Sequence, residues 1–194
     1  MGRKALYGRA EIQGAALELV STRGPQAVTV ADIANQIGAP TGSIYHRYSS
    51  REQLLAELWM DVVEAFQRAF VEALEPAADV RGAIEAAQLM IRWTRAHMRE
   101  ARLLLLYRRQ DFITGDWPAA LAERAQALEP QMGGALRAYC RRALGRADAE
   151  TMARARFALL DAPFGAIKPY VQKGGPLPPI LDELIAKTVR AVLA

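Results

Sequence analysis

Between residues 29 and 51 the sequence gathers small hydroxyl side chains together with aromatic and basic ones. The set begins at Thr29 and continues with Thr41, Gly42, Ser43, Tyr45, His46, Arg47 and Arg51. Hydroxyl, imidazole and guanidinium groups donate hydrogen bonds, and a guanidinium matches the geometry of a phosphate. This chemistry is noncovalent recognition of a polar, negatively charged partner.

The chain offers little for catalysis. Its two histidines, His46 and His97, lie far apart in the sequence, and its single cysteine, Cys140, sits in "RAYCRR" without a signal for a base. A buried, inert thiol is the favoured interpretation of Cys140. The sequence has no phosphate loop, no G-x-S-x-G motif and no metal-spaced cluster. We therefore expect no enzyme, no catalytic residue, no metal and no cofactor.

Two short helices, broken by "GAPTG" at residues 38–42, must position the polar set. Thr29 is a good N-cap for the first helix, with Asp32 at its third position. Gly38 ends that helix, and Pro40 opens the second one, because proline at the first helical position loses no needed donor. Two short helices joined by a tight turn that contains glycine form a helix-turn-helix.

The spacing inside this unit supports the same interpretation. Ala34 is small enough for the second helix to approach the first, Gly38 suits a left-handed turn, and the aliphatic Ile44 packs the second helix onto the first. The structural alternative is an ordinary helical corner that touches nothing. The second helix, at residues 40–48, is too polar for ordinary core, and its small residues suit base edges and phosphates.

The aromatic residues of the second helix divide between core and surface. We expect Tyr48 in the core and Tyr45 as a surface contact, whereas His46 either contacts DNA or is a solvated helix histidine. Arg47 and Arg51 come within reach of a phosphate backbone. Near the chain start, Arg3 and Lys4 either reach a minor groove or contact nothing.

At these residues the chain resembles the tetracycline-repressor (TetR) family of bacterial regulators. The stretch "TVADIANQIGAPTGSIYHRYSSREQLL" is similar to the family pattern T-x-x-x-I-A-x-x-x-G, a short helix ending in L-Y-x-x-F, then K-x-x-L. The resemblance covers residues 9–58. It implies phosphate contacts from Thr29, Tyr45 and Arg51, and base-facing positions for Thr41, Gly42, Ser43 and His46. Three residues depart from the pattern: Pro40 replaces a capping serine or threonine, Tyr48 a phenylalanine and Arg51 a lysine.

Apolar residues recur at helical spacing along the chain, which predicts an all-α fold of about nine helices. We expect a helix-turn-helix DNA-binding domain at residues 1–50 and a larger helical ligand-binding and dimerisation domain at 51–194. The fourth helix, from about Ser50 to Leu74, should open with a capping box of Ser49 and Glu52. Further helices are expected at 80–98, 99–112, 117–144, 148–171 and 178–193, with Pro163 kinking one of them.

Composition fits a soluble, globular chain. The 194 residues are 52% hydrophobic and 24% charged, which excludes a disordered chain. The net charge is +4, and residues 1–51 alone carry +3, a weak indication of a polyanion at that end. No apolar run is long enough to span a bilayer and no signal peptide is present, so a cytoplasmic location is expected.

The larger domain should hold a ligand and a partner chain. The resemblance implies a pocket for a small, largely apolar molecule between the fourth and seventh helices, and Trp93, His97 and Tyr107 are its expected wall residues. Aromatic residues at this spacing are otherwise core. Two apolar stripes at the chain end fit a four-helix homodimer interface, with packing onto the chain's own middle helices as the alternative. The expected interface residues are Phe157, Leu160, Phe164, Ile167, Leu181 and Ile185.

These observations predict a dimeric transcriptional regulator that binds a palindromic duplex and is released from it by a small-molecule effector. A repressor is the favoured form. The alternatives are a DNA-binding regulator or architectural protein without a ligand and, far less favoured, an enzyme.

Overall fold

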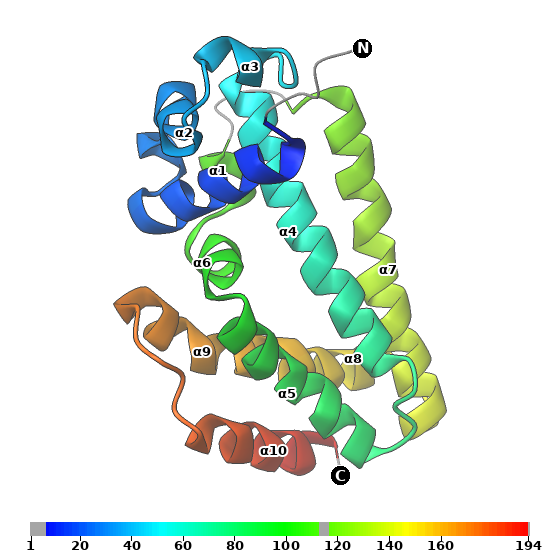
Figure 1. The fold of residues 1–194 in the computed structure, drawn as a ribbon. Coiled ribbons are helices and arrows are strands. Elements are labelled where there is room, and N and C mark those ends of the chain that lie inside the picture. Colours follow the sequence, from blue (N-terminus) through cyan, green and yellow to red (C-terminus); the bar gives the residue numbers. More distant parts are fainter. Residues whose placement is uncertain (1–6, 113–116, 194) are drawn as a thin grey trace.

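The structure, a computed structural model, describes residues 7–112 and 117–193, apart from the side chain of Glu129 (Figure 1). Within these ranges the regular elements are helices, so the expected all-α fold is confirmed. Counting α8, a π turn and α9 as one continuous element, the described ranges contain the nine helices that the sequence predicts.

The first three helices form a small unit at one end of the molecule, which we call the reader (Figure 1). Helix α1 spans Arg9–Arg23, α2 spans Val30–Ile37 and α3 spans Thr41–Tyr45. Gly24, with φ of 83°, ends α1, and a short 3₁₀ turn at Pro25–Ala27 follows. Glycine followed by proline therefore stops the first helix where the sequence predicts it.

Helix α4, at Arg51–Leu74, runs from the reader into the rest of the chain, side by side with α7 at Ala119–Leu144 (Figure 1). Its N-cap is Ser50, whose Oγ accepts the Gln53 N–H at 3.0 Å. The expected capping box of Ser49 and Glu52 is wrong by one residue. Ser49 donates its N–H and Oγ–H to Gln53 Oε1 instead, at 2.8 and 2.6 Å.

The remaining helices form a larger unit, the body, around α5 at Val80–Ala96. Helix α5 packs against α4, α9 and α10, and α6 follows it after a break at His97. The sequence predicts a kink at Pro163, and the structure has a π turn just before this residue. Proline has no N–H to donate, so the regular hydrogen-bond pattern of the helix is interrupted there. The bounds are α6 Met98–Leu106, α8 Ala149–Arg156, π turn Phe157–Asp161, α9 Ala162–Lys173 and α10 Ile180–Leu193.

Two hydrophobic clusters fill the reader and the body. The reader cluster joins α1–α3 to the first half of α4, including Leu54 and Leu58, and also contains Leu103 from α6. The body cluster joins the second half of α4 to α5 and to the helices from α7 to α10. Trp93 and Leu104 are half-buried and pack against both clusters, so a shift between the reader and the body must move their surroundings.

Cys140 belongs to the body cluster and is fully buried on α7. Burial raises the pKa of its thiol, which favours the unreactive form and supports the inert interpretation. Across the described ranges, no helix combines the length and apolarity needed to cross a membrane.

Alanine substitutions at Gly82 and Gly133 test how closely the α4–α5 connection packs against α5. A Cβ at Gly82 would come 2.7 Å from Ala77 Cα, so Gly82→Ala should lower the free energy of unfolding by about 1–3 kcal/mol. A Cβ at Gly133, inside α7, would meet nothing within 4 Å, so Gly133→Ala should raise it by about 0.4–1 kcal/mol. Urea denaturation of both variants measures whether the free energy of unfolding falls or rises. A Gly82→Ala protein as stable as Gly133→Ala would contradict the close approach of the α4–α5 connection to α5.

Candidate nucleic-acid interface

The turn between α2 and α3 has the geometry that its sequence predicts. Gly38 adopts φ of 66° and ψ of 28°, the left-handed conformation that glycine takes at least cost. The Ala39 N–H donates to the Ala34 carbonyl at 2.9 Å. Tyr7 holds the same turn from outside, because its hydroxyl donates to the Gly38 carbonyl at 2.8 Å. Sequence reasoning missed Tyr7, since no local pattern links residues 31 positions apart.

Helix α3 is anchored by one buried face. Ile44 and Tyr48 are 1% and 2% exposed, and both belong to the reader cluster. The core position expected for Tyr48 is confirmed, and burial raises the pKa of its phenol. The two anchors fix which side of α3 faces outward.

The predicted contact residues between positions 41 and 47 lie on α3 or directly after it, and most of them are exposed. Tyr45 is 52% exposed, which is unusual for so large an aromatic ring and agrees with its expected surface position. Ser43 is half-buried, and the exposed members of the set are Thr41, Gly42, Tyr45, His46 and Arg47. Among the described residues, Arg47 takes part in no ion pair or side-chain hydrogen bond, so its guanidinium is available to a partner. Arg3 and Lys4 lie outside the described residues.

Thr29 is the N-cap of α2, as expected, and its polar groups are already engaged. Its Oγ accepts the Asp32 N–H at 3.1 Å, and its own N–H donates to the Asp32 carboxylate at 2.9 Å. The Thr29 Oγ–H also donates to the Asp32 carboxylate, at 2.5 Å. This hydrogen bond and the one from the Thr29 N–H hold the pKa of Asp32 below its ordinary value, since both favour the charged carboxylate. The phosphate contact predicted for Thr29 remains a prediction, made by an exposed residue that also caps the helix.

Arg51 lies inside the fold to a degree that the sequence did not indicate. Its side chain is 24% exposed, Nε donates to the Val28 carbonyl at 2.6 Å, and Nη2 donates to the Pro25 carbonyl. It thereby ties the start of α4 to the connection between α1 and α2. Arg51 therefore stabilises the reader. Its phosphate contact stays a prediction.

The segment that contains α1, α2 and α3 is similar to known proteins. Residues 12–58 match the family described as "Bacterial regulatory proteins, tetR family". This segment is similar to the tetR family. The match covers α1 to α3 and the first part of α4, which is the reader and its attachment to the body.

A curated relative is the HTH-type transcriptional repressor KstR2 of Rhodococcus jostii, 32% identical over 78 residues, which are 40% of this chain and 38% of that protein. The chain thus spans little more than a third of the length of the curated relatives it matches.

Solved structures extend the likeness of fold to the whole chain. A TetR family transcription regulator from Marinobacter aquaeolei has a TM-score of 0.71 at 16% identity, with 96% of this chain and 95% of that one covered. The fatty acid degradation regulator FadR of Bacillus halodurans has a TM-score of 0.71 at 17% identity, with 100% and 96% covered. The matched family and its curated relatives are regulators and not enzymes.

The expected wall residues of a ligand pocket do not all line one cleft in the structure. Trp93 and His97 line one open cleft between α1, α4, α5 and α6. Tyr107 does not join them, because its ring packs edge-on against Phe112 and its hydroxyl lies 3.3 Å from where a Gly24 Cβ would stand. Tyr107 is therefore corrected from a wall residue to a contact between α6 and the end of α1.

A second cleft lies between α4 and α7, and it is a poor match for an apolar molecule. Its volume is about 490 Å³, and charged side chains of both signs line it. Arg124 bridges its wall by donating to Glu64 at 2.9 and 2.7 Å and to Asp61 at 2.9 Å. These hydrogen bonds raise the pKa of Arg124 above its ordinary value, so this cation stays charged and paired.

The residues expected to meet a partner chain also separate. Phe157 is 49% exposed and Phe164 is half-buried against Phe66, at 5.6 Å between ring centroids. The other four expected residues lie in the chain's own core: Leu160, Ile167, Leu181 and Ile185. For those four the prediction is wrong, because α10, α9 and the π turn all pack on α5. The exposed apolar residues of the end helices are Phe157, Ile180 and Leu184.

Arg51 and Arg47 form a matched pair of arginines. Arg51 is tied to the reader, whereas Arg47 has no side-chain partner among residues 7–112 and 117–193. Arg51→Ala should lower the free energy of unfolding by about 1–3 kcal/mol, because the Pro25 and Val28 carbonyls lose a charged donor. Arg47→Ala should change it by no more than about 0.5 kcal/mol, as exposed substitutions usually do. Thermal and urea unfolding of both variants measure the difference. Equal stability in the two would show that Arg51 does not clamp the reader.

Proposed function

We propose that the chain is a sequence-specific DNA-binding transcriptional repressor in which α3 enters the major groove. The observation that carries the proposal is the one-sided exposure of α3. Its apolar anchors Ile44 and Tyr48 are buried, while Thr41, Tyr45 and Arg47 point to solvent. Small hydroxyl groups at the start of a recognition helix suit base edges, and an unpaired arginine one turn later suits phosphate.

In this proposal the reader, residues 1–50, recognises the duplex, and residues 51–194 form the effector-binding and dimerisation domain. Thr41, Gly42, Ser43 and His46 face bases, while Thr29, Tyr45, Arg47 and Arg51 face phosphates. The location is cytoplasmic, where the chain has access to DNA. Residues 12–58, which match the family, are the part of the chain that supports DNA recognition most directly.

A homodimer follows from the exposed apolar residues at the chain end. Phe157 and Leu184 are 49% and 47% exposed, and both lie on the end helices that the sequence assigned to an interface. Covering such residues with a second copy removes apolar surface from water. Two-fold symmetry then requires a palindromic operator with half-sites about one helical turn, roughly 34–36 Å, or a multiple apart.

Release from DNA by a small, largely apolar effector completes the proposal. An effector shifts the equilibrium only by its differential affinity for the two states of the dimer. Helix α4 is the connection through which it acts, because α4 belongs to both hydrophobic clusters. A regulator without an effector is the second candidate, and it predicts operator affinity that no ligand bound in the body changes.

DNA binding is tested with a duplex recovered by selection from random sequences. Arg47→Ala should weaken binding to every sequence and reduce the salt slope by about one, as loss of one phosphate contact does. Thr41→Ala and His46→Ala should alter base preference, by roughly 1–3 kcal/mol where the contact is bidentate. Fluorescence anisotropy at several salt concentrations measures both effects.

The matched control is Arg81→Ala, which removes an arginine with an 87% exposed side chain from α5 on the body. It should leave affinity and salt slope unchanged, since α5 lies away from α3 (Figure 1). If Arg81→Ala weakens binding as much as Arg47→Ala, the contact is diffuse attraction to a basic chain and the assignment to α3 fails.

The dimer is tested by placing charge on the exposed apolar residues. Phe157→Glu with Leu184→Glu should give folded monomers at micromolar concentration, because neither side chain supports the core of its own chain. Tyr45→Glu, an equally exposed aromatic on α3, is the matched control and should stay dimeric. Light scattering reads the mass. A monomeric wild type, or a double variant that remains dimeric, contradicts the interface.

A further inference from the structure

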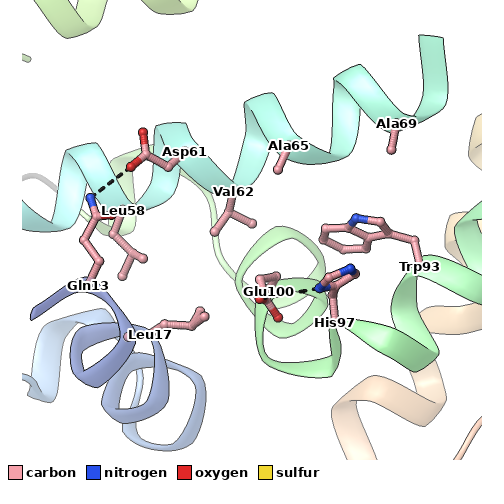
Figure 2. Close-up of a pocket in the computed structure, with 11 residues that line it drawn as sticks. Gln13, Leu17, Leu58, Asp61, Val62, Ala65, Ala69, Trp93, His97 and Glu100 are labelled. Atoms are coloured by element: carbon pink, nitrogen blue, oxygen red, sulfur yellow. Dashed lines mark hydrogen bonds and ion pairs between the residues drawn. The ribbon is translucent and has the colours of Figure 1, made fainter. Parts of the chain in front are cut away.

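An open cleft lies where the reader meets the body (Figure 2). Its volume is about 490 Å³, within the range of small-molecule sites. Helix α1 contributes Gln13, Gly14 and Leu17, while Trp93, His97 and Glu100 come from the opposite side, at the end of α5 and the start of α6. An occupant would therefore touch the reader and the body at once.

The middle of the cleft is apolar and roomy. Val62 from α4 lies in the middle of the cleft, Leu58 lies toward Gln13 and Leu17, and the small Ala65 and Ala69 leave room on the α4 side near Trp93 (Figure 2). The Trp93 ring is held by Phe66, edge to face at a centroid distance of 5.2 Å. A fixed indole beside small aliphatic side chains suits a flat, apolar body.

The charges of the cleft have one sign. Its lining includes two carboxylates, Asp61 and Glu100, and no lysine or arginine. Asp61 is already occupied, because Arg9, Gln13 and Arg124 each donate to it at 2.9 Å. This leaves Glu100 as the acceptor available to a ligand.

Glu100 is well placed for that role. Its side chain is 28% exposed, and its closest described partner is His97 Nδ1 at 3.7 Å, too far for a hydrogen bond. The His97 ring is tilted against Trp93 at a centroid distance of 5.1 Å, so the carboxylate lies beside the aromatic wall (Figure 2). A cation there would gain from both the carboxylate and the indole face.

We infer that this cleft binds a small, flat, apolar molecule that carries one protonated amine. The amine is held by Glu100, and the apolar rings lie between Trp93 and the α4 alanines. A carboxylic acid of the same shape is disfavoured, because the lining includes no lysine or arginine and its histidine, His97, already faces Glu100. The effect of the occupant on DNA rests on the proposed function, whereas its binding does not.

Binding is tested on the 194-residue protein without DNA. The probes are 9-(aminomethyl)anthracene and 9-anthracenecarboxylic acid, which share three rings and differ in charge. Anthracene fluorescence anisotropy should show that the amine binds and that the acid does not bind up to about 1 mM. Glu100→Gln should weaken the amine roughly tenfold, since a charged hydrogen bond is lost.

Two further variants locate the site. Ala65→Phe should abolish amine binding by filling the cleft, and its circular dichroism shows whether it is folded. Glu72→Gln is the matched control, because Glu72 lies on α4 but lines the other cleft. Absence of amine binding to the wild type, equal binding of the acid, or equal losses in Glu100→Gln and Glu72→Gln would each overturn the inference.

The consequence for DNA is measured separately. Saturating amine should weaken binding to the selected duplex by about 5–150-fold, the usual range of coupling between two sites. Unchanged DNA affinity with intact amine binding would refute the coupling and leave the binding site standing. Failure of the duplex to bind without any probe would instead refute the proposed DNA-binding function.

Discussion

The burial of Ile44 and Tyr48 is the constraint on which the rest of the proposed mechanism depends. Helix α3 has five residues, whereas an isolated helix in water needs about 12–15 to be even marginally stable. Its preceding residue, Pro40, also provides no side-chain cap. The helix therefore exists because the two anchors pack into the reader cluster, and the same packing decides which residues face outward. The packing that stabilises the reader therefore also determines which polar side chains of α3 are exposed.

The orientation of the reader is set by polar contacts that cross to the body. Asp61 on α4 accepts from Arg9 on α1 and from Arg124 on α7. Arg102 on α6 donates to the Ser21 carbonyl on α1 at 2.7 Å and to the Val171 carbonyl on α9 at 3.2 Å. Part-exposed ion pairs contribute only about 0.2–1 kcal/mol each, so such a connection is specific in geometry yet weak enough for a ligand to shift.

Sequence patterns predicted the helices and the turn well, because period and punctuation are local properties. Gly38 and Thr29 took their expected roles since a left-handed turn and an N-cap each depend on a few neighbouring residues. The N-cap of α4 is Ser50 in place of Ser49, because adjacent serines offer nearly the same spacing. The predictions that were wrong concerned tertiary contacts. The apolar stripe of α10 packs on α5 of the same chain, and the sequence pattern alone cannot distinguish this from packing on a second chain. Arg51, likewise, reaches carbonyls 23 and 26 positions earlier in the chain, which no local pattern reveals.

Hydrogen–deuterium exchange, with and without a selected duplex, tests most directly whether the outward face of α3 reads DNA. The account predicts that amides of α3 and of the first turn of α2 exchange more slowly in the complex, because DNA covers both helix starts. Amides of α5 and α10, which lie at the other end of the molecule, should keep their rates (Figure 1). Protection confined to the body, with unchanged exchange in α3, would contradict the account.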